Sequence, residues 1–200
     1  MAKTPFCALL AVALAVLSIP AAAQYAAVTA AANLNQLTDR AALIVRGTVM
    51  SAHVEKHPEF GALDTVVVRL RVKESFKGQA TGVHTFRQYI WDVRDIAASG
   101  GYQKGQDLLL MLIEPSRFGL SSPAGLEQGR FQIRRDAAGR EVAANGRANH
   151  GLFDDMVAQT ASKGIALSAR SQSLVARQPA GPVELRALGE LIRELAAGSP

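Results

Sequence analysis

The stretch that decides the fold is TVVVRLRVKESF, residues 65–76. Its apolar and charged side chains alternate with a period of two, which is typical of a half-buried antiparallel strand. One side carries the apolar residues Val66, Val68, Leu70, Val72 and Phe76, and the other carries Arg69, Arg71, Lys73 and Ser75. The stretch is therefore predicted to hold its apolar side in a core and its charged side in solvent.

Further strands are predicted on both sides of this one. Residues 43–49 alternate in the same way, and residues 83–93 are rich in aromatic and β-branched side chains. The run 108–113 is continuously apolar and short, which favours a strand buried on both faces. Residues 130–142 alternate around the turn residues 136–139, which predicts a hairpin.

Helices are expected at both ends of the strand-rich region. Residues 34–42 form the first, with Asn33 or Asn35 as its cap, and residues 182–197 form the last. The predicted fold is mainly β with peripheral helices: a small antiparallel barrel of five to six strands, closed or partly open, similar to the oligonucleotide/oligosaccharide-binding (OB) barrel. A β-sandwich is the alternative that the pattern leaves open.

Residues 1–23 have the three parts of a secretory signal peptide. Lys3 gives a positive start, residues 6–19 are apolar, and small residues at 21–23 predict cleavage before Gln24. The apolar run is shorter than the roughly 20 residues that span a bilayer, so no transmembrane segment is expected. The mature protein is expected to be periplasmic or secreted.

The mature chain is expected to form one barrel domain with appendages. The predicted parts are a flexible lead-in (24–33), the β-barrel domain (34–153), an irregular excursion with helical turns (154–181) and the C-terminal helix packing on the barrel (182–197). The single cysteine, Cys7, leaves with the signal peptide, which excludes thiol catalysis and cysteine–zinc sites. The net charge of the full chain is +5, and it falls to +4 when Lys3 leaves with the signal peptide. This surplus is mild and spread out and decides little; after export, a solvated surface or an anionic envelope component is expected instead of a nucleic-acid partner.

The histidines do not predict a metal site. His53 and His57 are four residues apart, which places them about 13 Å apart on an extended chain. Both are expected to be solvated loop residues, and His84 is expected at the surface. No metal and no cofactor are therefore expected.

No catalytic residue is predicted. The sequence has no G-x-S-x-G elbow, no H-E-x-x-H and no glycine loop for a phosphate. A small hydrolase would need Asp92, Asp95 and His150 to converge in one pocket.

The candidate ligand-binding residues fall in two groups. Tyr89, Trp91 and Asp92 could form a shallow sugar-binding patch, although a Trp and a Tyr in a strand also suit core packing. The second group, Asn145, Asn149 and His150, lies in a polar loop, where turn chemistry explains the asparagines equally well.

Outward arginines could in addition make a basic face on neighbouring strands, or simply keep the surface solvated. They are Arg69, Arg71, Arg87, Arg130, Arg134 and Arg135.

Four segments in order resemble an uncharacterised family of secreted bacterial proteins. They are residues 43–49, residues 66–78 ending in Phe-Lys-Gly, residues 105–112, and residues 122–131 ending in Gly-Arg-Phe. The resemblance runs from about Leu34 to Phe153 and implies an OB-like barrel, similar to that of tissue inhibitors of metalloproteinases. Those inhibitors chelate zinc through an N-terminal cysteine, which the mature chain lacks.

These observations favour an exported, non-enzymatic binding or interaction module that contacts a protein or a glycan in the cell envelope or outside. Two alternatives stay open at this point. One is an inhibitor or accessory protein of an exported metalloprotease, which the resemblance implies, and the other is a small hydrolase.

Overall fold

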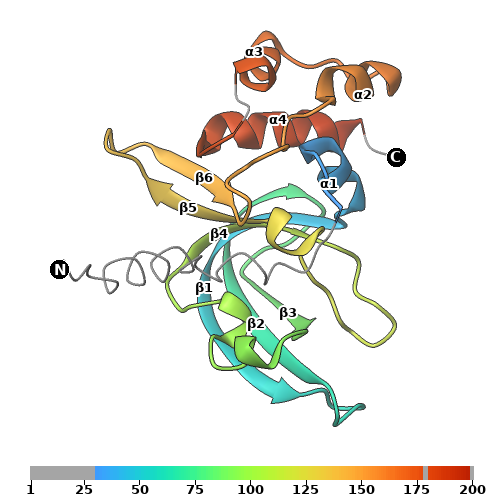
Figure 1. The fold of residues 1–200 in the computed structure, drawn as a ribbon, viewed down its shortest axis with the longest axis vertical. Coiled ribbons are helices and arrows are strands. Elements are labelled where there is room, and N and C mark those ends of the chain that lie inside the picture. Colours follow the sequence, from blue (N-terminus) through green and yellow to red (C-terminus); the bar gives the residue numbers. More distant parts are fainter. Residues whose placement is uncertain (1–29, 178–179, 199–200) are drawn as a thin grey trace, which may run out of the picture.

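A computed structural model describes residues 30–177 and 180–198 of the chain (Figure 1). The predicted signal peptide, its cleavage site before Gln24 and most of the predicted lead-in lie outside these residues. In chain order the described helices are α1 (Leu34–Arg40), α2 (Met156–Ser162), α3 (Ala169–Arg177) and α4 (Leu185–Ala197). The described strands are β1 (Leu43–Lys56), β2 (Asp64–Lys77), β3 (Val83–Tyr89), β4 (Asp107–Leu112), β5 (Arg130–Arg135), β6 (Glu141–Asn145) and β7 (Val183–Glu184).

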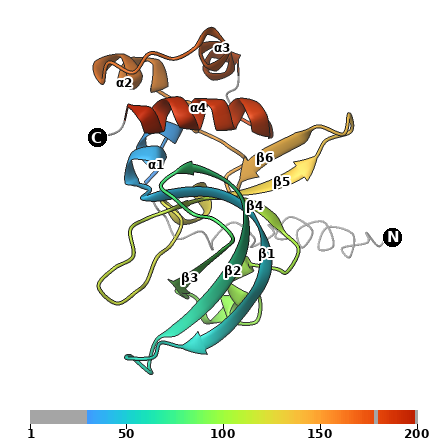
Figure 2. The ribbon, with the colours of Figure 1, turned by 180° about the vertical axis from the view of Figure 1, so that it is seen from behind.

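The described strands form a single antiparallel sheet in the order β3-β2-β1-β4-β5-β6-β7. The predicted class, mainly β with peripheral helices, is confirmed. The sheet curls strongly, as Figure 2 shows, but it does not close. The strands therefore curl as the barrel prediction expects without forming a closed barrel. It has seven strands within the described residues instead of five or six, and it is one sheet instead of a sandwich.

Bulges in β1 produce much of the curl. The pairing of β1 with β2 shifts register at three places, and each shift bends the strand and increases its twist. At one of them sits Gly47, where a Cβ atom would lie 2.5 Å from the carbonyl oxygen of Arg71. Only glycine fits at that point, because the backbone of β2 passes too close.

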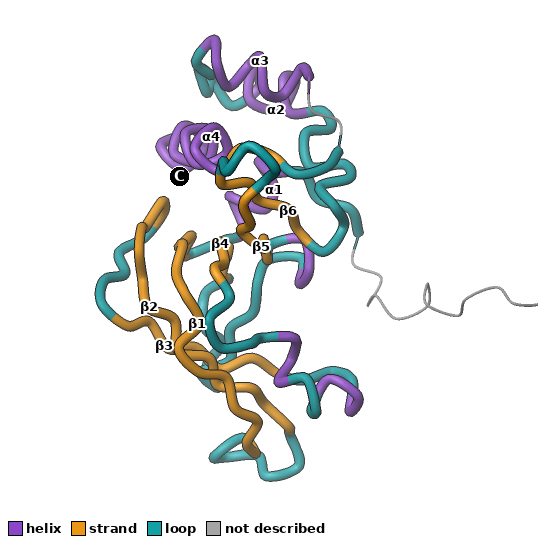
Figure 3. The backbone as a smooth tube through the Cα atoms, turned by 90° about the vertical axis from the view of Figure 1, so that its left-hand side faces the viewer, coloured by secondary structure: helices purple, strands orange, loops and turns teal. Residues whose placement is uncertain are grey.

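Two apolar cores lie on the two faces of the sheet. On the inner face of the curl, β1, β2 and β3 contribute side chains such as Val45, Val68 and Phe86. On the other face, β4 to β6 pack against α1 and α4, with α2 and α3 lying outside them, as Figure 3 shows.

β4 belongs to both cores. Leu108, Leu110 and Leu112 point into the curl, whereas Leu109 and Met111 point toward the helices, and all five are at most 2% exposed. The prediction of a strand buried on both faces is confirmed.

The predicted alternation of residues 65–76 holds over residues 66–73. It fails at Phe76, which packs in the other core, against the helices, because the pairing with β1 shifts register there. Val66, Val68 and Leu70 are fully buried, while Arg69 and Arg71 between them are exposed.

The predicted first helix is confirmed with Asn33 as its cap. Asn33 and Gln36 form a capping box, in which each side chain accepts a hydrogen bond from the other residue's backbone N–H. The end of the predicted flexible lead-in is packed, since Ala32 is 6% exposed and its N–H donates to the side chain of Gln128. The lead-in prediction is therefore wrong for these last residues.

The region after the barrel is more regular than predicted. Residues 156–162 and 169–177, expected to be irregular, form α2 and α3, and Met156 is fully buried. Pro182 does not start the last helix, because Val183 pairs with Ala143 as part of β7 and α4 begins after it. Among the described residues no helix is both long and apolar enough to cross a membrane.

Candidate functional site

A short loop after β3 carries the first group of predicted site residues. We call residues 91–96 the Trp91 loop; it is light green in Figure 1. The predicted strand 83–93 ends early, at Tyr89, because the Asp92 side chain accepts a hydrogen bond from the backbone N–H of Arg94 at 2.9 Å. This bond starts a 3₁₀ turn (η2, Val93–Asp95) and takes the chain away from the sheet.

The loop exposes large apolar side chains. Trp91 is 73% exposed and Val93 is 76% exposed, so neither contributes to a core. Tyr89 at the end of β3 meets Trp91 edge to face, with 4.9 Å between the ring centroids. The sequence left open whether Trp91 packs in a core or belongs to a surface patch with Tyr89. In the structure Trp91 lies on the surface next to Tyr89 and does not pack in a core.

Asp92 is engaged within the loop. The side chain and the backbone N–H of Arg94 both bond to its carboxylate, and they lower the pKa of Asp92 to about 2. Asp92 is therefore ionised and paired at neutral pH. In the described part of the chain, no side-chain hydrogen bond or ion pair joins any two of Asp92, Asp95 and His150. Asp95 bonds to Asp92 through its backbone N–H, which donates to the Asp92 carbonyl at 2.9 Å.

The second group lies in the turn that follows β6. Asn145 and Asn149 each accept, on the side-chain oxygen, a hydrogen bond from the backbone N–H of the other, at 2.8 and 2.9 Å. The side-chain NH₂ of Asn149 also donates to the carbonyls of Ala143 and Gly181. The side-chain oxygens of both asparagines thus serve the turn, as its chemistry predicts, and their NH₂ groups bond to backbone carbonyls, while His150 beside them is exposed.

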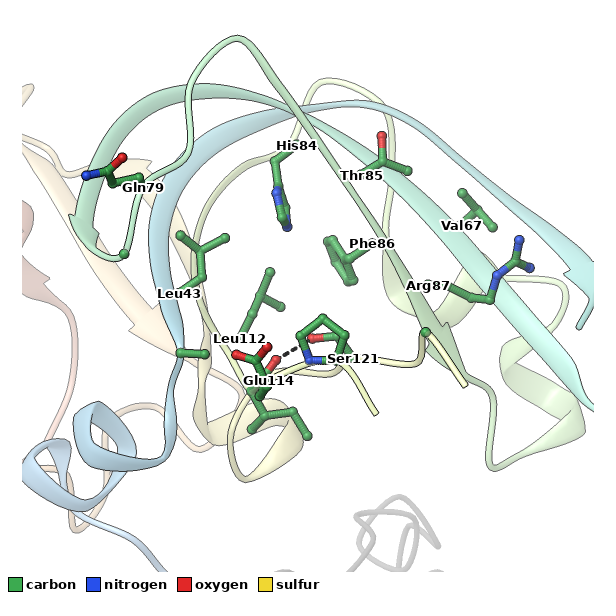
Figure 4. Close-up of a pocket in the computed structure, with 15 residues that line it drawn as sticks. Leu43, Val67, Gln79, His84, Thr85, Phe86, Arg87, Leu112, Glu114 and Ser121 are labelled. Atoms are coloured by element: carbon green, nitrogen blue, oxygen red, sulfur yellow. Dashed lines mark hydrogen bonds between the residues drawn. The ribbon is translucent and has the colours of Figure 1, made fainter. Parts of the chain in front are cut away.

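A hollow at one end of the curl was not predicted from the sequence. It has a volume of about 380 Å³ and lies between β3 and the segment 113–121. Figure 4 shows the rings of His84 and Phe86 projecting into it from β3. Its wall includes Leu43, His84, Phe86, Leu112, Ile113 and Glu114.

His84 is half-buried in this hollow instead of lying freely at the surface. Its ring stacks on that of Phe86 at 6.3 Å, and burial lowers the pKa of His84 below its ordinary value of 6.5. The strand prediction for residues 83–93 contains a usable signal, because His84 is two residues from Phe86 and so lies on the same side of the strand as that buried ring.

His57 is not a solvated histidine. It is 2% exposed, and its Nε2 donates to the carbonyl of Phe118 at 2.9 Å. Its Nδ1 accepts from the backbone N–H groups of Glu59 and Phe60. His53, by contrast, is exposed as predicted and pairs with Glu55, but it lies within β1 and not in a loop. In the described ranges no three His, Cys, Asp or Glu side chains gather in a way that could hold a metal.

Comparison of the chain with models of known protein families finds no match, and neither curated proteins nor solved structures give one.

Proposed function

We propose that this protein is an exported binding module that contacts a protein or glycan partner through the Trp91 loop. The observation that carries the proposal is the exposure of two large apolar side chains in one short loop, Trp91 at 73% and Val93 at 76%. Exposed aromatic residues are enriched at interfaces, where burying one large ring supplies much of the binding free energy.

The composition of the loop favours a protein over a glycan. A sugar-binding site pairs an aromatic face with polar groups that are free to bond hydroxyls. Here the Asp92 carboxylate is already bonded to Arg94, and Val93 adds an aliphatic side chain that suits an apolar protein pocket.

The test expresses the full chain with its own leader and purifies the exported protein. Cleavage before Gln24 is expected and is checked by intact mass. The protein is then cross-linked to partners in envelope extract and probed on a glycan array, alongside the variant Trp91→Ala. Truncating the exposed ring should leave circular dichroism and Tm unchanged and reduce partner capture at least about tenfold, as for an interface hot spot.

A matched control is Val157→Ala on α2, since Val157 is also an exposed apolar residue, at 63%. It should capture partners as the wild type does. Equal capture by the wild type and Trp91→Ala would show that the loop is not the contact. Turnover of a hydrolase substrate by the wild type, abolished by one substitution, would replace the proposal with an enzyme.

A further inference from the structure

β3 is the edge of the sheet next to the hollow, and part of that edge is unpaired. The register of β3 against β2 bonds Ile90 to Asp64 and Gly82 to Val72. Bonding in an antiparallel pair alternates, so Val83 and Thr85 turn their backbone N–H and C=O groups away from β2. Within the described residues, no other segment bonds to these groups.

The chain itself shows that this edge accepts another strand. One step along the same edge, the backbone N–H of Ser121 donates to the carbonyl of Arg87 at 2.8 Å, and Leu120 bridges Arg87 in parallel orientation. The segment 113–121 pairs with β3 only at this point. The edge at Val83 and Thr85 therefore has the geometry for strand addition but no occupant.

The hollow lies beside the unpaired edge. A strand added next to β3 would point alternate side chains to the same side as His84 and Phe86, which is into the hollow. Leu43 and Leu112 wall the hollow with apolar surface, and burial keeps His84 neutral at pH 7. Apolar side chains are therefore the ones that suit the inward positions.

The outer side of the same edge is basic. Arg69 lies opposite Thr85 and Arg71 lies opposite Val83, and both are exposed. Neither side chain makes a hydrogen bond or an ion pair in the described part of the chain. The outward side chains of an added strand would lie within reach of these long side chains, which favours acidic residues there.

We propose that the β3 edge binds an extended segment of a protein partner in which apolar and acidic side chains alternate. The partner segment pairs with β3 through backbone hydrogen bonds to Val83 and Thr85. The hollow selects its apolar side chains, and Arg69 and Arg71 select its acidic side chains. This site does not include the Trp91 loop. Binding at the β3 edge can therefore be disproved without disproving binding by the Trp91 loop, and the reverse also holds. A second copy of the chain pairing edge to edge would bring its own Arg69 and Arg71 beside those of the first copy, and like charges repel. A partner segment with acidic side chains therefore fits the edge better.

The probe is the peptide fluorescein-Glu-Val-Glu-Leu-Glu-Val-Glu-amide, and the full-length exported protein is titrated into it while its fluorescence anisotropy is measured. The same peptide with lysine for glutamate is the charge control, and a backbone N-methylated version removes its N–H donors. Binding of the acidic peptide alone, with slowed hydrogen exchange at the Val83 and Thr85 amides, is the expected result.

The decisive variant is Thr85→Pro. The N–H of Thr85 faces away from β2, so proline removes the edge donor without breaking the sheet. Thr85→Pro should lower the affinity for the acidic peptide at least about tenfold. Thr85→Val keeps the backbone N–H donor and should therefore keep the affinity. If Thr85→Pro does not fold, the double variant Arg69→Glu, Arg71→Glu decides, since it should reverse the preference from the acidic to the lysine peptide.

Three outcomes would overturn the proposal. One is no binding of the acidic peptide up to about 1 mM. Another is binding that neither Thr85→Pro nor N-methylation weakens, or that protects amides elsewhere. The third is a concentration-dependent dimer that Thr85→Pro abolishes, which would make the occupant a second copy.

Discussion

Asn149 stabilises the fold through one buried amide group. It is fully buried with a backbone φ of +59°, a left-handed conformation that asparagine adopts more readily than most residues. Its side chain bonds the backbones of Asn145, Ala143 and Gly181, so it joins the end of β6 to the chain just before β7.

Replacing Asn149 with alanine should lower the free energy of unfolding by roughly 2–4 kcal/mol, because two buried carbonyls and one N–H lose their partners. Urea denaturation measures this. The neighbouring exposed residue gives the control, and His150→Ala should change the free energy by less than about 0.5 kcal/mol. A stable Asn149→Ala variant that loses partner capture would assign Asn149 to the binding site instead of the fold.

Between elements, the tip of the β1–β2 hairpin is tied to the segment 113–121 by His57. The imidazole donates to the carbonyl of Phe118, and the rings of Phe60 and Phe118 pack edge to face at 4.9 Å. The same segment forms one wall of the hollow. His57 therefore positions the wall that stands across from β3.

His57→Ala should cost about 1–3 kcal/mol of stability, because it leaves the Phe118 carbonyl and two N–H groups without their partner. Hydrogen exchange in residues 113–121 should accelerate more than exchange in β4. His53→Ala, at an exposed position in β1 four residues before His57, is expected to change neither quantity. Unchanged exchange in 113–121 after His57→Ala would mean that other contacts hold this wall.

The elements that could be predicted from sequence are those with a local pattern. The burial of one side of residues 65–76 could be predicted from their alternation. The burial of residues 108–113 could be predicted from their continuous apolar run. β7 has two residues, too few for any pattern, and its pairing with β6 depends on residues about forty positions away. The burial of His57 likewise depends on Phe118, which nothing near His57 in the chain indicates.

The candidate site was predictable to a similar extent. Tyr89, Trp91 and Asp92 could be named from the sequence, but their exposure could not, because strand propensity extends through Val93. What ends the strand is the Asp92 side chain bonding to Arg94. The hollow was missed because its wall comes from β1, β3, β4 and the segment 113–121, which only the tertiary structure brings together.

Across the whole molecule, a charged cluster joins β1 to its neighbour β4 and to the more distant β6. Arg46 of β1 bonds Asp107 of β4 at 2.8 Å and Glu141 of β6 at 2.7 Å. Burial alone would lower the pKa of Arg46. The two carboxylates outweigh the effect of burial, so the pKa of Arg46 is raised. The hydrogen bond from Arg46 in turn lowers the pKa of Glu141 below its ordinary 4.5.

Acid should therefore weaken the protein through Glu141. The unfolded chain takes up the proton at a higher pH than the folded one, so this stabilisation is complete above about pH 4.5 and is lost as the pH falls through the folded value. Glu141→Gln should be less stable at neutral pH and lose less stability on acidification. The check is the urea midpoint over a pH series, with exposed Glu59→Gln as control. Parallel pH curves for the wild type and Glu141→Gln would contradict the assignment.

The strand order also governs what happens while the chain is still emerging. β1 pairs with β2 on one side and with β4 on the other, yet β3 and the Trp91 loop come before β4 in the chain. A nascent chain that has emerged only as far as Gln106 therefore carries an unpaired edge along β1, and such an edge can pair with strands of other chains. The protein stays vulnerable to aggregation until β4 has emerged and paired with that edge.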